Sequence, residues 1–354
     1  MSSKTSFSGP SGTNRSNGLL TPLHSNESDS EAAYIALRDN VALIDRTHTG
    51  RIECAGADVL DLISRLSTNE VMSLEVGQGA ATVLTTPKGR IIDVLTMSRS
   101  RDSVLVLTAW SSRQKILEHI DFFTFGEDIT TCDITGQTGS YAIAGPNAPD
   151  IMMSIAGVDL ERYANTTVSF DSIDTSIVRT DFLGLPAYEL VVQADKMVSL
   201  GKKCFSLANE FGFVVAGENV VETVRVERGV PVYGAELSES YNPLEANLIN
   251  LVSFTKGCYV GQEVITRLDT YKKVKRALVG LKWDTGTLPG SGDRLLINNK
   301  QVGVVTSSAC SPISREGSAL GYLRVGHTQP GTAVSIEADT GEIQATVVEL
   351  PVNG

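Results

Sequence analysis

The sequence lacks any long hydrophobic run, and none approaches the roughly 18–20 apolar residues that a membrane-spanning helix needs. Cysteine is also scarce: there are five, and the closest pair, Cys258 and Cys310, lies 52 positions apart. This spacing excludes zinc knuckles and thioredoxin-like motifs, and an odd, scattered set is typical of a reducing compartment. With no apolar secretory segment at the N-terminus, we expect a cytoplasmic protein. A mitochondrial transit peptide is less favoured, because Lys4 and Arg15 are the only basic residues among the first 30.

Positive charge is in short supply, with 30 Lys and Arg against 41 Asp and Glu and a net charge of −11. This balance argues against nucleic acid or an anionic membrane surface as a partner. The sequence also contains no Walker loop, no His-Glu-x-x-His helix and no Gly-x-Ser-x-Gly elbow. We therefore expect no metal site, nucleotide-binding P-loop or hydrolase triad.

The apolar and charged fractions, 42% and 20%, are those of a globular protein, and 354 residues predict two to three domains. Residues 1–30 are rich in Ser, Gly, Asn and Pro, which predicts a disordered tail. Residues 31–275 alternate helical and strand patterns, which predicts an α+β region of two subdomains. From residue 276 to 354, short strands separated by Gly and Asn turns predict a β-barrel domain.

Several local patterns are specific enough to assign. The run AAYIALRDNVALI (32–44) has helical spacing, and so does GADVLDLISRLS (56–67). The segment ATVLTTPKGRIIDVLTMSR (81–99) predicts two strands joined by a Pro-Lys-Gly turn. Ser111 and Gln114 have the spacing of a capping box for the helix that follows.

A basic, cysteine-containing loop stands out in this acidic chain. In KGCYVGQE (256–263), Gly257 and Gly261 allow a sharp turn that would present Cys258. Lys256 would favour its thiolate. Between residues 255 and 276 there are six basic and two acidic residues, a local charge of +4 that suits a small polyanion. The alternative is a buried, inert cysteine beside a solvated basic surface.

Two carboxylates lie in otherwise apolar strands. Asp93 is in GRIIDVLT and Glu189 is in LPAYELVVQ. A carboxylate buried on a strand needs hydrogen-bond donors, and it can accept paired N–H bonds from a guanidine-like ring edge such as that of a pterin. Either residue could instead point outward from a half-exposed strand.

These motifs carry a family resemblance over about residues 31–350. KGCYVGQE resembles the signature loop of YgfZ-type folate-binding proteins, relatives of the glycine-cleavage T-protein, an aminomethyltransferase. The blocks LIDRTHTGRIECAG, TTPKGRIIDVLT, GLPAYEL and VRVERGVPVYGAELSESYNPLEANL resemble the superfamily in the same order. The resemblance implies two α+β domains and a C-terminal β-barrel in a ring around a central tetrahydrofolate site.

The resemblance also implies roles for individual residues. Glu189 would bind the pterin edge, and Tyr188 and Arg225 would contact the folate in its pocket. Asp93 would lie near the reactive nitrogens and Cys258 on the surface near the folate mouth. The basic residues, Lys256 and Arg267 among them, would suit a glutamate or polyglutamate tail. T-proteins usually have paired aspartates where this chain has Asp93 followed by Val94, and the alignment leaves open which aspartate is retained.

Three functions follow as hypotheses. The favoured one is a tetrahydrofolate-binding protein that supports iron–sulfur cluster assembly or repair, with Cys258 as the essential thiol and iron–sulfur proteins as partners. The second is a tetrahydrofolate-dependent aminomethyl or methyl transferase in which Asp93 polarises the folate, with a lipoyl carrier protein as partner. The third is a non-catalytic scaffold that has lost folate.

Overall fold

The computed structural model describes residues 27–170, 172–284, 287–339 and 341–352. Most of the tail predicted at 1–30 lies outside the described residues. Its last four residues already belong to helix α1 (Glu27–Asp39), so the helix begins earlier than the predicted end of the tail.

The first α+β domain is built on a six-stranded sheet, antiparallel except for one parallel pair, β1 with β11. In spatial order the strands are β11 (Val214–Val215), β1 (Ala42–Asp45), β7 (Thr138–Ala144), β10 (Ala187–Gln193), β9 (Ile173–Arg179) and β8 (Asn165–Phe170). Helices α4 (Ala148–Ala156) and α5 (Met197–Phe211), with the 3-10 turn η2 (Ala194–Lys196), cover one face. Helices α1 and α6 (Glu218–Arg228) cover the other.

The second α+β domain has a five-stranded antiparallel sheet. Its strands in spatial order are β3 (Gly79–Thr85), β4 (Ile91–Arg99), β5 (Val104–Thr108), β2 (Gly50–Ala55) and β6 (Thr130–Asp133). Helices α2 (Val59–Leu66) and α3 (Arg113–Phe122), the latter preceded by η1 (Trp110–Ser112), pack on one face. The predicted Pro-Lys-Gly turn does join β3 to β4.

The C-terminal region is a closed six-stranded barrel, as predicted. Its strands are β12 (Arg276–Trp283), β13 (Arg294–Ile297), β14 (Lys300–Cys310), β15 (Gly317–Arg324), β16 (Ala333–Ala338) and β17 (Gly341–Val348). A connecting segment with η3 (Ile249–Leu251) and α7 (Gln262–Thr270) leads into it.

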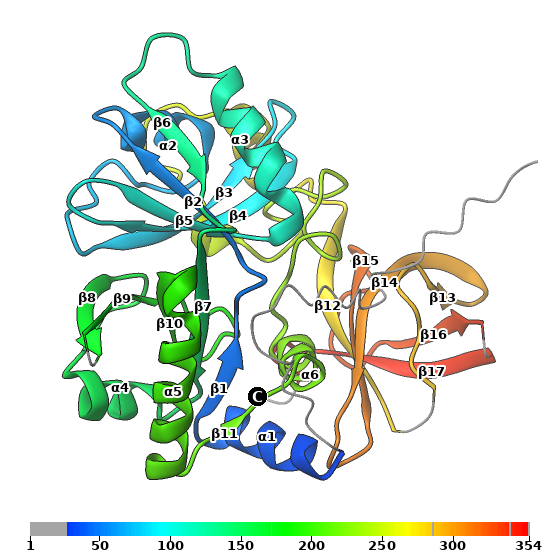
Figure 1. Ribbon diagram of the computed structural model, residues 1–354. Helices are drawn as coiled ribbons and strands as arrows, with labels where there is room; N and C mark the ends of the chain where they lie inside the picture. The colour runs from blue at the N-terminus through cyan, green and yellow to red at the C-terminus, as the bar shows by residue number, and fades with distance from the viewer. Residues whose placement is uncertain (1–26, 171, 285–286, 340, 353–354) are drawn as a thin grey trace, which may run out of the picture.

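The two α+β domains and the barrel form three bodies (Figure 1), and side chains of all three pack together in a shared apolar cluster. It combines side chains of β3 and β4, α6, the segment 237–251 and barrel strands β12, β14 and β15. The chain crosses between the two α+β domains twice, from β1 to β2 through residues 46–49 and from β6 to β7 through residues 134–137. Among the described residues, no helix is long and apolar enough to cross a membrane.

Two local predictions were wrong. The helical pattern at 32–44 ends at Asp39, and residues 42–45 form β1. All four apolar side chains from Val41 to Ile44 are buried, because β1 is inserted between β7 and β11. Tertiary pairing therefore overrides helical spacing here. Helix α3 forms as predicted, but Ser112 is its N-cap and Gln114 bonds Glu118 instead of closing a capping box.

Candidate functional site

Glu189 lies at the centre of a polar site in the first domain, on the face of the sheet that α1 and α6 cover. Its side chain is only 1% exposed. Arg46 donates two hydrogen bonds to its Oε1, from Nε at 3.2 Å and from Nη2 at 3.1 Å. Among the described residues, Oε2 accepts one bond, a long one of 3.5 Å from the Ser140 hydroxyl. One oxygen of the buried carboxylate is thus paired with Arg46, and within the described chain the other accepts only this one long hydrogen bond.

Strand alternation explains the direction of Glu189. On β10, Tyr188 and Leu190 point into the core beneath α4 and α5, so Glu189 between them points to the opposite face, where α1 and α6 lie. Arg46 follows β1 at the first crossing between the domains, and its guanidinium stacks 3.9 Å above the Phe182 ring. Residues 143 positions apart in the sequence therefore form one ion pair.

Arg51 fixes the crossing that carries Arg46. It is fully buried, and its guanidinium donates to the carbonyls of Thr49 (2.8 Å), Thr135 (3.1 Å) and Thr138 (3.0 Å). Its Nη2 also reaches the carbonyl of Thr47 at 3.2 Å. Arg51 thus ties both crossings together and sets the backbone on which Arg46 sits.

His48 lies on the same crossing and is exposed to solvent. Its pKa is nonetheless lowered from 6.5 to about 4, chiefly through desolvation by the surrounding protein and secondly through the nearby charge of Arg46. The imidazole is therefore neutral at physiological pH and can donate or accept a hydrogen bond beside the site.

Asp93 is buried, but it faces away from the apolar cluster shared by the three bodies. Its Oδ2 accepts bonds from the Thr108 hydroxyl (2.6 Å), the Ser112 hydroxyl and the Ala109 amide (3.2 Å). Its Oδ1 accepts the amide of Val94 at 2.7 Å. Burial raises the pKa of Asp93 above its ordinary value, and these donors act in the opposite direction.

A β-bulge sets this direction. The β3–β4 register shifts at Ile92, which has no partner between Ile91 and Asp93. As a result Asp93 turns toward α3, while Val94 packs against the shared apolar cluster. The side chain that faces the barrel side of the sheet is therefore a valine, and the one aspartate present supports β5 and η1.

The predicted cysteine loop is docked on the second domain. The Lys256 ammonium donates to three carbonyls: Ser64 in the last turn of α2 (2.7 Å), its C-cap Ser67 (3.0 Å) and Asn69 two residues beyond (2.5 Å). Cys258 is exposed, which decides between the presented and the buried cysteine that the sequence left open. The prediction that Lys256 activates the thiolate finds no support, because its donors are directed at α2.

Several side chains of the basic segment 255–276 already have partners within the protein. Lys256 is turned inward, and Arg276 bonds Glu245 at 3.2 Å. Lys272 is 81% exposed and pairs with Asp269, and Arg267 is exposed on α7. Within the described chain, no hydrogen bond or ion pair connects this segment with Glu189, so its binding of a folate tail stays a prediction.

The chain resembles known proteins over nearly its whole length. Residues 16–256 match the GCVT N-terminal domain, and residues 276–352 match the glycine cleavage T-protein C-terminal barrel domain. An aminomethyltransferase from Halothermothrix orenii is 30% identical over 326 residues, which cover 89% of each protein. The chain belongs to the glycine cleavage T-protein family.

Two further relatives extend this result. A chloroplastic protein of Arabidopsis thaliana, named as a transferase, is 31% identical over 91% of this chain and 73% of its own length. The crystal structure of an aminomethyltransferase from Bartonella henselae matches the fold with a TM-score of 0.80 at 21% identity, covering 91% of this chain and 89% of that one. These matches support the T-protein superfamily as a whole and do not single out its YgfZ-type members.

Two residues of this T-protein family member that were predicted to contact folate, Arg225 and Tyr188, make contacts within the protein. Arg225 is 4% exposed and donates to Glu222 (2.7 Å), Glu236 (3.1 Å) and the Val230 carbonyl (2.7 Å). Since Ser307 on β14 also bonds Glu236, this network joins α6 to the barrel. Tyr188 lies on the face of β10 opposite Glu189, in the core under α4 and α5. Neither arrangement brings these side chains to Glu189.

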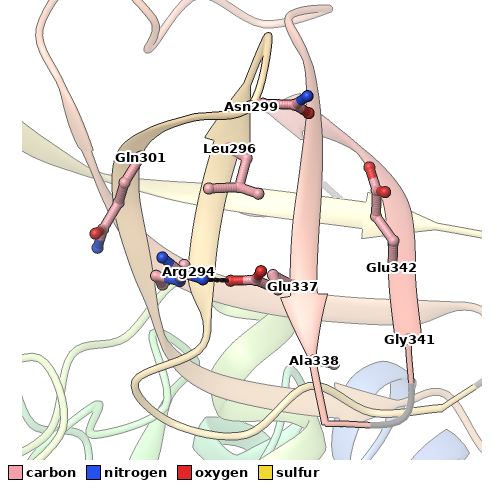
Figure 2. A pocket seen from close by; sticks show the side chains of 8 residues that line it. All are labelled: Arg294, Leu296, Asn299, Gln301, Glu337, Ala338, Gly341 and Glu342. Carbon is pink, nitrogen blue, oxygen red and sulfur yellow. Dashed lines mark ion pairs between the residues drawn. The ribbon is translucent and has the colours of Figure 1, made fainter.

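A pocket lies against strands β13, β14, β16 and β17 of the barrel and contains none of the predicted site residues (Figure 2). Arg294 of β13 and Glu337 of β16 form an ion pair across it, and Gln301 and Glu342 lie at its sides. Among the described residues, no group of three or more His, Cys, Asp or Glu is placed to hold a metal ion.

Sequence reasoning missed Arg46 and Phe182, which complete the Glu189 site, and Arg51, which supports it. Arg46 and Arg51 lie in the block LIDRTHTGRIECAG that resembles the superfamily, and DRTHTGR directly follows an apolar run. That pattern predicts the end of a strand and says nothing about the partner of an arginine 143 residues away.

Proposed function

We propose that this protein binds tetrahydrofolate and transfers a one-carbon unit to or from it, as an aminomethyl or methyl transferase. The observation that carries the proposal is Glu189, a buried carboxylate with one open oxygen on the face of the first-domain sheet that α1 and α6 cover. A pterin edge presents two parallel N–H donors, which suit such a carboxylate. The names of the full-length relatives favour transfer over the iron–sulfur role that the sequence alone suggested.

Catalysis in this proposal depends chiefly on positioning the donor against the folate. The donor would be a small amine or a thioether, delivered free or on a lipoyl carrier protein. Asp93 serves a structural role, because its carboxylate bonds β5 and η1 and does not face the space on the barrel side of the sheet.

The test is a calorimetric titration with tetrahydrofolate. Glu189→Ala should weaken binding at least about 100-fold, because it removes the charged acceptor of two hydrogen bonds. Cys258→Ser should bind like the wild type, since Cys258 is exposed on a loop docked elsewhere. Wild-type protein that shows no heat of binding and no thermal protection would refute the proposal in favour of a scaffold without folate.

Support of iron–sulfur assembly is the second candidate, and the exposed thiol of Cys258 is the observation that favours it. The two functions separate cleanly in assays with Cys258→Ser. One-carbon transfer should be unchanged in this variant. A loss of cluster repair with transfer intact, or with no transfer detected in the wild type, would favour the iron–sulfur function.

Asp93→Asn tests the structural role of Asp93. The change keeps the size of the side chain and mimics the protonated form that burial favours. We expect a loss of about 1–3 kcal/mol in the free energy of unfolding and transfer within a few-fold of wild type. If turnover disappears while the melting temperature is unchanged, Asp93 acts directly in the chemistry.

A further inference from the structure

Arg46 makes the contacts that a pterin ring edge would make. A guanidinium is planar and presents adjacent N–H donors, as does the amino-pyrimidinone edge of a pterin. Arg46 directs two such donors at Glu189 Oε1 and stacks on Phe182 with 3.9 Å between the guanidinium carbon and the ring centroid. One carboxylate and one aromatic face thus already hold a guanidine-like group from the same chain.

We propose that Arg46 is a built-in competitor for the ligand edge at Glu189, so that folate binds only when the Arg46 side chain leaves the carboxylate. This inference rests on the proposed function. It adds that Arg46 sets the affinity of the site for folate and controls the ligand's access to Glu189. A ligand that offers no guanidine-like edge has no means of displacing Arg46.

The geometry allows the side chain to move without the backbone. The amide and carbonyl of Arg46 are held by Ser140, through bonds of 3.0 Å to the Ser140 carbonyl and 3.1 Å from its hydroxyl. The Arg46 side chain is 17% exposed, whereas that of Glu189 is 1% exposed. The Arg46 side chain therefore has access to solvent, and the Glu189 side chain beneath it has almost none.

The contact is also incomplete as an ion pair. Both Arg46 donors bind the same oxygen, while paired Arg–carboxylate contacts at their strongest use both oxygens. A ring edge that donates to Oε1 and Oε2 together would use the oxygen that now has only the 3.5 Å contact with Ser140. The bound ligand would gain a bond that the internal guanidinium does not make.

The first experiment is a tetrahydrofolate titration of Arg46→Met and wild type. The variant should bind at least about tenfold more tightly, since no charged hydrogen bond has to be broken. Arg113→Met is a matched control, because Arg113 also stacks on an aromatic ring (Trp110, 3.8 Å) and pairs with a carboxylate (Asp133, 2.7 Å) in the other domain. Equal or weaker binding by Arg46→Met would overturn the inference.

A second experiment separates this inference from the proposed function and does not use folate. Thermal melts of Arg46→Ala with methylguanidinium should show a rise in melting temperature that is absent in wild type and in Arg46→Ala combined with Glu189→Gln. If tetrahydrofolate binds no form of the protein but methylguanidinium still protects Arg46→Ala, folate binding is wrong and the guanidine-edge site stands. If methylguanidinium does not protect Arg46→Ala, the competitor role is wrong, whatever folate does.

Discussion

Arg51→Met should lower the free energy of unfolding by about 3–5 kcal/mol, the loss typical when one partner of a buried charged network is removed. The guanidinium is fully buried and has four carbonyl acceptors within 3.2 Å. Methionine fills a similar volume but donates no hydrogen bond, so these carbonyls would be left unsatisfied away from water. Urea denaturation monitored by circular dichroism measures the effect.

Arg113→Met is the control for this prediction. Its guanidinium is 19% exposed and pairs with Asp133 near the surface, so we expect a loss of about 1 kcal/mol. A loss under about 1 kcal/mol for Arg51→Met would show that the two crossings are held by their other contacts. At temperatures where Arg51→Met is still folded, its affinity for tetrahydrofolate should also fall, because the backbone of Arg46 loses its support.

Lys256→Met should release the cysteine loop from α2 and lower the free energy of unfolding by about 3 kcal/mol. The ammonium satisfies three carbonyls at the end of α2, and the aliphatic stem of methionine satisfies none. Hydrogen exchange of the amides in 253–261 should become faster, because the docking contacts of this segment are lost. Lys272→Met removes an 81% exposed lysine of the same basic segment and should change stability by less than about 0.5 kcal/mol.

Lys256 also predicts a dependence on pH. Its pKa is lowered from 10.5 to about 8, because burial disfavours the ammonium. Between these two values the folded protein has released a proton that the unfolded chain still binds, so the free energy of unfolding rises with pH, by at most about 1.4 kcal/mol per pH unit. Below about pH 8 the group is charged in both states and contributes no slope. The rise should be missing in Lys256→Met, and equal slopes in the two proteins would contradict the lowered pKa.

Patterns that repeat within one segment were predictable from the sequence. Helix α2 follows from apolar side chains spaced along a single helix face, and the barrel follows from short strands between Gly and Asn turns. A hairpin signal of the same kind placed β3 and β4 on either side of Lys88 and Gly89. In each case the residues that decide the structure lie within a few positions of one another.

Predictions that depended on a partner from elsewhere in the chain were less successful. The apolar run at Val41–Ile44 fits a helix as well as a strand, and its pairing with β7, about a hundred residues away, decides the outcome. Lys256 is two positions from Cys258, which suggested a thiolate partner, but three carbonyls around the end of α2 bind it more completely. Nothing in the sequence near Arg225 predicts the network in which it joins α6 to the barrel through Glu236.

The sequence by itself determined the α+β domains and the barrel, and it marked Glu189 and Cys258 as candidates without deciding whether either side chain is buried. Only the tertiary structure decided that Arg46 pairs with Glu189 and that Asp93 faces α3. An ion pair across 143 residues depends on how two crossings between domains are aligned, and a single bulged residue reverses the direction of an aspartate. Local sequence fixes which groups a strand carries, whereas sheet register and domain contacts fix what those groups meet.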